Sequence, residues 1–390
     1  MKYIVLTTLL SLASFVTAAN VLAGSYLLNL GSEELVEAGG LDICVPGYSV
    51  PSLVDWNNDE RPDLVIGEGS YAYPGKVRVY LNGGSDSVPQ FVDYFYVQSG
   101  SSDLVVPSSG CLGCFPRVVY WDADDRKDLV VGLADGTIKI FLNTAADDVP
   151  VFDAGATVAT GVADMPTDLA IDVGSRATPA FVDWDHDDRT DLVVGALDGK
   201  IHIYLNCGCG GAVPPNFWVW QLSGAFAQEN GSDLVVPSNR SSPVVLDLDG
   251  DGKKDLLAGN TEGELLFYPN VGTDTQPSFS GFSLVESSGI PINLSGSPRS
   301  RPSVCDWTGD GYFDVLIGAG DGKVHLYQSI GQPGDVDKDY DVDLADFALL
   351  AASWQQTDNG SRNYADLTGD GKVNIDDLRR LAENWLLGAK

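Results

Sequence analysis

A short segment recurs five times along the chain, and this repeat limits the folds open to it more than any other feature. The copies begin at Pro51, Pro116, Pro179, Pro243 and Pro302, so that successive starts lie 59 to 65 residues apart. Each copy joins two apolar runs through an acidic loop and ends in glycine. A period of this length with strand-rich units is typical of a propeller or another repeat array.

The third unit illustrates the organisation of one repeat. Apolar runs at 180–184, 191–194 and 200–206 alternate with turns, and a fourth run at 216–222 follows a proline-rich loop. Along 200–206 apolar and polar side chains alternate, as in a strand with different neighbours on its two faces. Four strands per unit make one propeller blade. The sequence therefore predicts an all-β, five-bladed β-propeller over roughly residues 25–330, followed by a small all-α domain.

The two ends of the repeat region predict how the ring closes. The last repeat stops near Gln328 without a fourth strand of its own, whereas residues 34–46 align with residues 95–107 of the first unit. We therefore expect an N-terminal strand within 30–38 to pair with the strand at 323–328. This pairing would remove an open sheet edge, which otherwise invites aggregation.

Each repeat places oxygen-bearing side chains at loop positions 1, 3, 5 and 9. Ca²⁺ takes six to eight oxygen ligands, and a tight loop with oxygens on alternate residues supplies them. We predict four propeller calcium sites, and a weak or empty site in the second copy, where Tyr120 occupies position 1. The alternative is a set of acidic hairpin turns, because aspartate and glycine are common turn residues. The candidate ligands are Asp55, Asn57, Asp59 and Asp63; Asp122, Asp124 and Asp128; Asp183, Asp185, Asp187 and Asp191; Asp247, Asp249, Asp251 and Asp255; and Asp306, Thr308, Asp310 and Asp314.

Over roughly residues 25–330 these units resemble the FG-GAP/VCBS repeat, an integrin-α-like propeller repeat. The resemblance rests on the Asp-x-Asp-x-Asp-x-x-x-Asp spacing followed by three apolar residues and glycine. It implies a secreted, calcium-stabilised scaffold and fixes no activity. The sequence departs from the family at Glu60, Asp125 and Asp188, which stand where a loop glycine is usual, so these residues are expected to adopt a positive φ.

The C-terminal segment changes to two loop–helix units. Each twelve-residue loop carries side-chain oxygens at positions 1, 3, 5, 9 and 12, which is EF-hand-like ligand spacing, and position 7 can offer its backbone carbonyl. The candidate ligands are Asp335, Asp337, Asp339, Asp341, Asp343 and Asp346 in the first loop, and Asp366, Thr368, Asp370, Lys372, Asn374 and Asp377 in the second. Each loop runs into a short amphipathic helix. The expected apolar side chains are Phe347, Leu349, Leu350 and Trp354, then Leu378, Leu381, Trp385 and Leu386.

The duplicated unit, with aspartate instead of glutamate at position 12, resembles a type I dockerin over residues 334–388. That resemblance implies attachment to a cohesin domain on a scaffold or surface protein. Tyr340 replaces the glycine usual at position 6, which leaves the affinity of the first site open. The candidate recognition residues Leu344, Ala345, Ile375 and Asp376 do not identify the cohesin type. The alternative is a calcium-clamped C-terminal cap that recruits no partner.

Residues 1–19 have the pattern of a signal peptide, with Lys2, an apolar core and small residues before the expected cleavage site. We therefore expect a secreted protein, extracellular or associated with the cell surface, and no later stretch is apolar enough for a membrane span. The formal net charge of −32 argues against nucleic acid and anionic membranes as partners. Because most of this charge lies in the candidate calcium loops, the protein without calcium should be less stable.

Six cysteines remain after processing of the signal. An even count in an exported chain favours disulfides, with fifteen possible pairings. A zinc site built from Cys111, Cys114, Cys207 and Cys209 is the alternative, but oxidising surroundings favour disulfides. The other two cysteines are Cys44 and Cys305.

The sequence contains no nucleophile elbow, phosphate loop or catalytic zinc spacing. Arg78, Lys139, His202 and His325 fall in one repeat column, which forms either a polar substrate-facing stripe or the wetter face of a strand. Trp56, Trp121, Trp184 and Trp307, at loop position 2, are expected to pack between blades instead of binding sugars.

These observations favour a non-catalytic, calcium-stabilised propeller that binds glycan or protein, with a polysaccharide or glycoprotein as the expected ligand. Its dockerin would attach it to a cohesin-bearing extracellular assembly for polysaccharide breakdown. The alternative is a dockerin-bearing polysaccharide lyase or glycoside hydrolase on a propeller scaffold. A hydrolase needs two carboxylates at a defined separation, and most aspartates here are already assigned to calcium loops.

Overall fold

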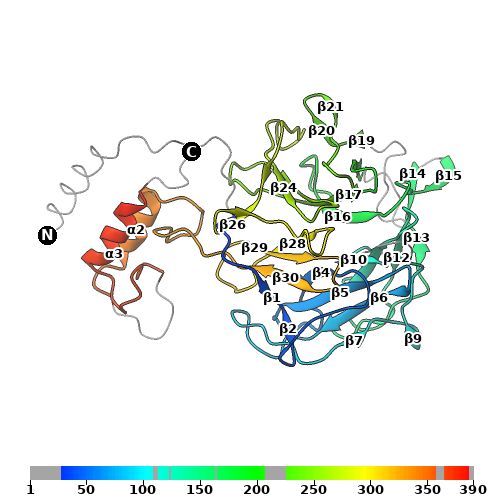
Figure 1. Cartoon of the computed structure of the whole chain (residues 1–390), viewed down its shortest axis with the longest axis horizontal. Helices are drawn as coiled ribbons and strands as arrows, with labels where there is room; N and C mark the ends of the chain where they lie inside the picture. The colour runs from blue at the N-terminus through cyan, green and yellow to red at the C-terminus, as the bar shows by residue number, and fades with distance from the viewer. Residues whose placement is uncertain are drawn as a thin grey trace. The chain divides into compact units, whose positions relative to one another are not determined.

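The computed structural model describes residues 28–108, 113–122, 124–162, 165–206, 225–356 and 364–385 (Figure 1). The chain divides into two compact units. One unit is Leu30–Ser329, and the other combines Met1–Asn29 with Ile330–Lys390.

Within the described residues, the unit Leu30–Ser329 contains five four-stranded antiparallel sheets. Four of them follow chain order: β4 (Val50–Val54), β5 (Asp63–Ser70), β6 (Tyr73–Tyr80) and β7 (Phe95–Tyr96); β10 (Phe115–Val119), β11 (Asp128–Gly132), β12 (Ile138–Phe141) and β13 (Ala156–Thr157); β16 (Thr178–Val182), β17 (Asp191–Gly195), β18 (Ile201–Tyr204) and β19 (Ala225–Phe226); and β22 (Ser242–Leu246), β23 (Asp255–Gly259), β24 (Leu265–Tyr268) and β25 (Ser283–Leu284). The first strands of successive blades contact one another in a closed ring. The predicted five-bladed propeller is confirmed.

The fifth blade confirms the predicted closure of the ring. It combines β28 (Arg301–Cys305), β29 (Asp314–Gly318) and β30 (Val324–Tyr327) with the N-terminal strand β1 (Glu34–Leu35). In the register of this pair, Glu34 faces Leu326 and Leu35 faces His325. The chain therefore closes its propeller by hydrogen bonds between residues almost 300 positions apart in sequence.

A short hairpin follows the fourth strand of each blade. The five hairpins are β2 (Glu37–Ala38) with β3 (Leu41–Asp42), β8 (Gln98–Ser99) with β9 (Ser102–Asp103), β14 (Ala159–Val162) with β15 (Met165–Ala170), β20 (Gln228–Glu229) with β21 (Ser232–Asp233), and β26 (Glu286–Ser287) with β27 (Ile290–Pro291). The prediction of the third blade's fourth strand at 216–222 is wrong, because β18 pairs instead with β19, which directly precedes its hairpin as in the other blades. The segment 216–222 itself lies outside the described residues.

The hydrophobic cores lie between neighbouring blades. Trp184 packs with Val193 of its own blade and with Leu256 and Phe279 of the next. The four loop tryptophans are only 2–6% exposed, which confirms that they pack between blades; they are Trp56, Trp121, Trp184 and Trp307. Because each core needs two blades, a single repeat cannot bury its apolar surface alone.

The glycine that ends each repeat allows consecutive blades to approach closely. A Cβ atom at Gly195 would lie 2.3 Å from the carbonyl oxygen of Ser241, and one at Gly318 would lie 2.3 Å from that of Ser49. Real Cβ atoms do not come so close to a backbone oxygen. The recurring glycine is therefore a requirement of the contact between blades.

The second unit contains two described helices, α2 (Leu344–Ala352) and α3 (Ile375–Glu383). Both begin with a capping box, formed by Asp343 with Asp346 and by Asn374 with Asp377. A capping box satisfies backbone N–H groups that the first helical turn leaves without partners. The two predicted loop–helix units are thus confirmed.

A single small core joins these two helices. Its buried members are Val336, Val342, Leu350, Ala365, Val373, Leu378 and Leu381, with Phe347, Trp354, Leu367 and Trp385 packed around them. The expectation that Leu349 belongs to the apolar face is wrong, because its side chain is 42% exposed. Phe347 and Leu350 define the inner face of α2, and Leu349 turns away from it. Leu386 lies outside the described residues.

Candidate metal centres

The acidic propeller loops join the first strand of each blade to the second, so they lie together at one end of the propeller. The aspartate at position 1 closes each loop. In the third blade Asp183 accepts backbone N–H bonds from Asp187 at 3.0 Å and Asp188 at 2.9 Å. The equivalent residues Asp55, Asp247 and Asp306 accept the same pair of bonds. Tyr120 offers no carboxylate at this position, as the sequence indicated.

The aspartate at position 9 braces two strands of its blade. Asp191 is fully buried, and its Oδ2 accepts the N–H of Trp184 at 2.8 Å while its Oδ1 accepts the N–H of Asn206 at 2.6 Å. Asp63, Asp128, Asp255 and Asp314 make the same two contacts in their blades. Sequence reasoning missed this brace, although the asparagine that follows the third strand in four units was a signal for it.

Burial raises the pKa of the aspartates at position 9. The pKa rises to about 6 for Asp128, Asp191, Asp255 and Asp314, and the pKa of Asp63 also rises. Desolvation is the largest cause in each case, because a buried carboxylate loses the water that stabilises its charge. A bound cation would favour the charged form instead.

Three propeller loops bring carboxylates close enough to share one ion. One oxygen from each member of a group lies within 4.8 Å of the others; the groups are Asp122, Asp124 and Asp128; Asp183, Asp185 and Asp191; and Asp247, Asp249 and Asp251. Two atoms at position 3, Asp185 Oδ1 and Thr308 Oγ1, are buried without a hydrogen-bond partner. A buried oxygen without a partner is costly, and a cation in the loop would supply one. The residues therefore fit Ca²⁺, which prefers carboxylate and hydroxyl oxygens.

In four of the five loops, a basic side chain of the loop forms an ion pair with the aspartate at position 5. Position 7 holds a basic residue whose side chain pairs with the position-5 aspartate: Arg61 with Asp59, Arg126 with Asp124, Arg189 with Asp187, and Lys253 with Asp251. The hydrogen bond from Arg61 lowers the pKa of Asp59. In the fifth loop Tyr312 occupies position 7. This pairing was not predicted, and it partly balances the charge of the loops.

The non-glycine residues expected at strained positions do adopt left-handed backbone. The φ angles are 66° at Glu60, 59° at Asp125 and 64° at Asp188. Tyr340 of the C-terminal unit has a φ of 70°, at the position where the second loop has Gly371. Such angles are uncommon for residues other than glycine, asparagine and aspartate. These loops therefore keep their shape against a local backbone preference.

In the first C-terminal loop two carboxylate groups meet at Asp346. One comprises Asp335, Asp337 and Asp346, and the other Asp341, Asp343 and Asp346. Asp346 is fully buried, accepts the N–H of Asp343 at 2.7 Å and also binds the N–H of Val336. Burial raises the pKa of Asp337 to about 6, and the neighbouring carboxylates add to the shift.

The second C-terminal loop repeats this geometry. Asp377 is fully buried and accepts the N–H of Thr368 at 2.9 Å and of Asn374 at 2.7 Å. Asp366 Oδ2 accepts the N–H of Gly371 at 2.7 Å. The position-12 aspartate thus links the start of the loop to the start of the helix in both units.

The polar column on the third strands does not form a shared substrate-facing stripe. Arg78 pairs with Glu68 at 2.5 Å, and His325 Nδ1 lies 2.6 Å from Glu33 Oε1. His202 lies edge-on to Phe226, and burial lowers its pKa. Each of these contacts stays within one blade, and Arg78 and His325 are only 7% and 5% exposed, so these two side chains are buried polar groups and not part of a solvated strand face.

Of the six cysteines, the described three are free: Cys44, Cys114 and Cys305. The disulfide expectation therefore fails for them. Buried Cys114 donates to the carbonyl oxygen of Lys76 at 3.0 Å, just as Ser49 donates to that of Lys323 at 2.5 Å. Its thiol thus holds two blades together, and burial raises its pKa to about 12. Cys111, Cys207 and Cys209, and with them the alternative zinc site, lie outside the described residues.

Family comparisons agree with this geometry. FG-GAP-like repeats match residues 183–258 and 247–317, and the Dockerin type I domain matches residues 333–384. The larger unit is therefore a five-bladed β-propeller with FG-GAP-like repeats. The smaller unit carries a type I dockerin domain.

A comparison with curated proteins found no match. Solved structures that match part of this chain include the GH43_1 enzyme from Xanthomonas citri, with 10% identity, a TM-score of 0.43, and coverage of 84% of this chain and 95% of that one. The catalytic domain of Coprinopsis cinerea GH62 alpha-L-arabinofuranosidase has 10% identity, a TM-score of 0.43, and coverage of 78% and 98%. Likenesses at these scores carry no argument about the activity of this chain.

Proposed function

We propose that this protein is a calcium-stabilised propeller that its dockerin domain attaches to a cohesin-bearing extracellular partner. The paired loop–helix units within residues 333–384 carry the proposal. Leu344 and Ile375 occupy the first position of α2 and α3, and their side chains are 70% and 53% exposed. Two apolar side chains at equivalent exposed positions are suited to contact a partner.

Calcium has a separate role in each unit under this proposal. In the propeller, the ions would neutralise the loop carboxylates and satisfy buried oxygens such as Asp185 Oδ1. In the dockerin, the ions would hold Asp335, Asp337 and Asp346 together and so fix the start of α2. Because unligated carboxylates repel one another, the loops close fully only with a cation bound.

Secretion of the protein follows from the signal-like residues 1–19 and from the dockerin domain, whose cohesin partners we place outside the cell. In the part of the chain that the structure describes, no helix is both long and apolar enough to cross a membrane. The proposed role is the display of a glycan- or glycoprotein-binding propeller on an assembly that degrades polysaccharides.

An enzyme on the same scaffold is the second candidate. A glycoside hydrolase needs two carboxylates facing each other across the scissile bond. The buried carboxylate Glu68 has a raised pKa because of desolvation, but it pairs with Arg78 and accepts a bond from Tyr96 at 3.1 Å. These contacts favour a structural role for Glu68, so binding remains the lead proposal. Assays for new reducing ends and for unsaturated products on a polysaccharide panel separate binding from catalysis.

Capture of cohesin domains by the full chain in calcium tests the proposal. The matched comparison is a chain that stops after residue 330. Capture by the full chain alone supports delivery by the dockerin, whereas equal capture by the truncated propeller contradicts it.

A further inference from the structure

A small cavity opens at the end of the propeller opposite the acidic loops. It lies where the inner strands β16, β22 and β28 begin, and its volume is about 20 Å³. Four arginines line it, Arg176, Arg240, Arg299 and Arg301, together with serine, threonine and asparagine side chains. None of the lining residues carries a carboxylate. In a chain with a net charge of −32 this concentration of positive charge is exceptional.

Three of these arginines occupy one equivalent position of the repeat. Arg176, Arg240 and Arg299 each stand three residues before the proline that opens the third, fourth or fifth copy. Their φ angles are 62°, 61° and 81°, in the left-handed region that a long side chain seldom adopts. Backbone in such regions is typical of functional sites, where surrounding structure enforces it. The repeat thus presents three guanidinium groups at the same end of the ring.

Two of the three serines that line the cavity are occupied in joining blades. Ser241 donates to the carbonyl oxygen of Lys200 at 2.7 Å and accepts the N–H of Ala196 at 3.0 Å. Ser300 donates to the carbonyl oxygen of Glu264 at 2.6 Å and accepts the N–H of Asn260 at 3.0 Å. Recognition of a ligand in the cavity therefore falls to the guanidinium groups.

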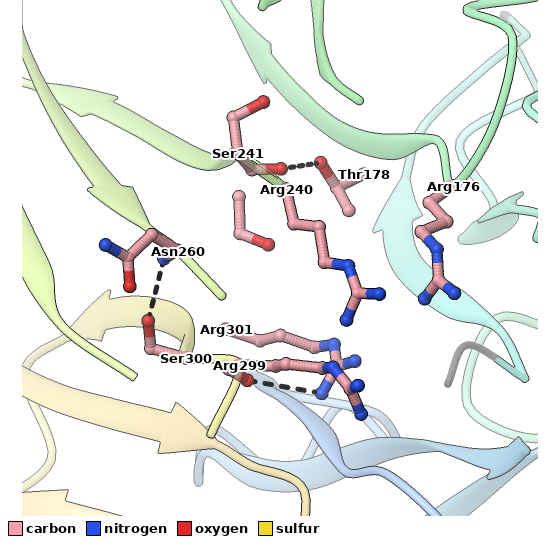
Figure 2. Close-up of a pocket in the computed structure, with 9 residues that line it drawn as sticks. Arg176, Thr178, Arg240, Ser241, Asn260, Arg299, Ser300 and Arg301 are labelled. Carbon is pink, nitrogen blue, oxygen red and sulfur yellow. Dashed lines mark hydrogen bonds between the residues drawn. The ribbon is translucent and has the colours of Figure 1, made fainter. Parts of the chain in front are cut away.

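The Tyr48 ring packs against the two arginines of the fifth blade that line the cavity. The guanidinium carbons of Arg299 and Arg301 lie 4.9 and 5.0 Å from the centre of the Tyr48 ring, and Arg299 also donates to the Tyr48 hydroxyl. Arg299 Nε is buried without a hydrogen-bond partner, and burial lowers the pKa of this side chain. Figure 2 shows the ends of Arg240, Arg299 and Arg301 gathered together, with Arg176 facing them. Guanidinium groups that converge on one small cavity favour an oxyanion between them, because each can donate two parallel hydrogen bonds to it.

Exposed aromatic side chains lie at the same end of the propeller. The first blade has a longer hairpin between β5 and β6 than the other blades, and Tyr71 and Tyr73 in it are 86% and 51% exposed. Both line an open hollow with Pro74 and Val105. The hairpin connects to the arginine cluster through Tyr48, whose N–H donates to the carbonyl oxygen of Gly69 at 3.2 Å. Tyrosine offers an apolar face and a polar tip, which suits contact with sugar rings.

We propose that the arginine cavity binds the carboxylate or sulfate group of an acidic polysaccharide. The planar fork of arginine matches such oxyanions with two parallel hydrogen bonds. The cavity holds about one or two water molecules, so it admits the charged group while the sugar rings stay outside on the tyrosine-bearing end. The inference refines the glycan-binding role proposed above and rests on it for the nature of the polymer.

The test is isothermal titration of the full chain, in calcium, with short oligogalacturonates and with dextran sulfate. Methyl-esterified oligogalacturonates and plain dextran are the uncharged controls, and sodium sulfate is the free-anion control. We expect the charged polymers to bind and the uncharged ones not to bind. The two charged ligands also distinguish a carboxylate from a sulfate as the preferred group.

Arg299→Gln and Arg240→Gln should each weaken this binding by about tenfold or more, because each removes charge-assisted hydrogen bonds. They lie on different blades, and melting curves identify any variant that does not fold. Arg379→Gln, which removes an exposed charge in α3, is the matched control and should bind like the parent.

Unchanged binding in both folded cavity variants would overturn the proposal, as would equal binding of charged and uncharged polymers. Binding of sodium sulfate without binding of either charged polymer would overturn it as well. Capture of cohesin domains by Arg299→Gln and by Arg240→Gln should be unchanged. A failure of the cavity proposal is thereby distinguished from a failure of the dockerin proposal.

Discussion

The acidic loops of the propeller and those of the C-terminal unit both carry side-chain oxygens on alternate residues. They differ in the backbone groups that the last aspartate of the loop binds. In the propeller, Asp191 links its loop to the end of the third strand of a sheet, through the N–H groups of Trp184 and Asn206. In the C-terminal unit, Asp346 links the start of its loop to the first turn of a short helix. One loop is attached to an extended sheet, and the other is attached to a short helix of the small C-terminal core.

The hydrophobic support behind these loops differs as well. Four propeller cores are each shared by two neighbouring blades, so the sheets that share them stabilise one another. The C-terminal unit has one small cluster around Val342, Leu350 and Leu381. Units this small depend on metals or disulfides because their cores are insufficient. If the loops bind calcium as proposed, the same ligand spacing would stabilise the fold of one unit and would be a condition for folding in the other.

The largest expected effect is that of calcium removal on the full chain. With chelator, the C-terminal unit should lose its helices, because the loop carboxylates repel one another and the core is small. The propeller should keep its sheets and melt at a lower temperature. Circular dichroism across a calcium titration measures both. Loss of both units at the same calcium concentration would remove the distinction between them.

A smaller effect on stability should distinguish the two roles of aspartate within one loop, namely the structural hydrogen bonds of Asp191 and the metal binding proposed for Asp185. Asp191→Asn leaves a backbone N–H facing an amide group, so it should cost about 1–3 kcal/mol of unfolding free energy with or without calcium. Asp185→Asn changes an oxygen that has no protein partner, and should cost stability only in calcium. Denaturant unfolding under both conditions is the measurement. If Asp191→Asn left the unfolding free energy unchanged in chelator, the aspartate at position 9 would act only as a metal ligand.

In the presence of calcium, loss of one aspartate should lower the melting temperature by different amounts in the third and the second loop. Asp187→Ala should lower the melting temperature more than Asp122→Ala, because the second loop already lacks a carboxylate at Tyr120. Glu383→Gln removes an exposed carboxylate outside every loop and is the control. Equal losses in the two loop variants would indicate that the loops act only as turns.

The smallest effect is a dependence on pH in chelator. Burial raises the pKa of four position-9 aspartates from 3.8 to about 6 in the folded protein. The folded state therefore binds more protons than the unfolded state between these values, and propeller stability should fall as pH rises from about 4 to 6. Saturating calcium should reverse the trend, since it binds the deprotonated form. A melting temperature in chelator that rises across this range would contradict the raised pKa values.

Much of the fold could be predicted because the repeat specifies contacts between blades. The position-2 tryptophans and the terminal glycines recur at a fixed spacing, and both are required by the packing of one blade on the next. The closure by β1 was predictable because the last repeat visibly lacked a strand. The fourth strand at Ala225–Phe226 was not, since two residues are too few for a pattern of alternation.

The sites were only partly predictable for a related reason. Aspartates on alternate residues predict the loops. The hydrogen bond between Asp191 and the N–H of Asn206 was not predictable, because Asn206 follows a different strand and lies close only in the folded protein. Cys114 was misread because its role is the one that serine performs in other blades. The arginine cavity collects residues from three repeats outside the acidic motif, and its signal in the sequence was the arginine that recurs three residues before the opening proline of the third, fourth and fifth copies.

Cohesin capture by the variant with both Asp335→Ala and Asp366→Ala shows whether the C-terminal unit needs its acidic loops to bind a partner. Each change removes the position-1 carboxylate of a C-terminal loop and leaves every propeller residue in place. The account predicts that capture in calcium is abolished while the propeller melts at its usual temperature. Capture equal to that of the parent chain would contradict the account, because the C-terminal unit would then work without its metal loops.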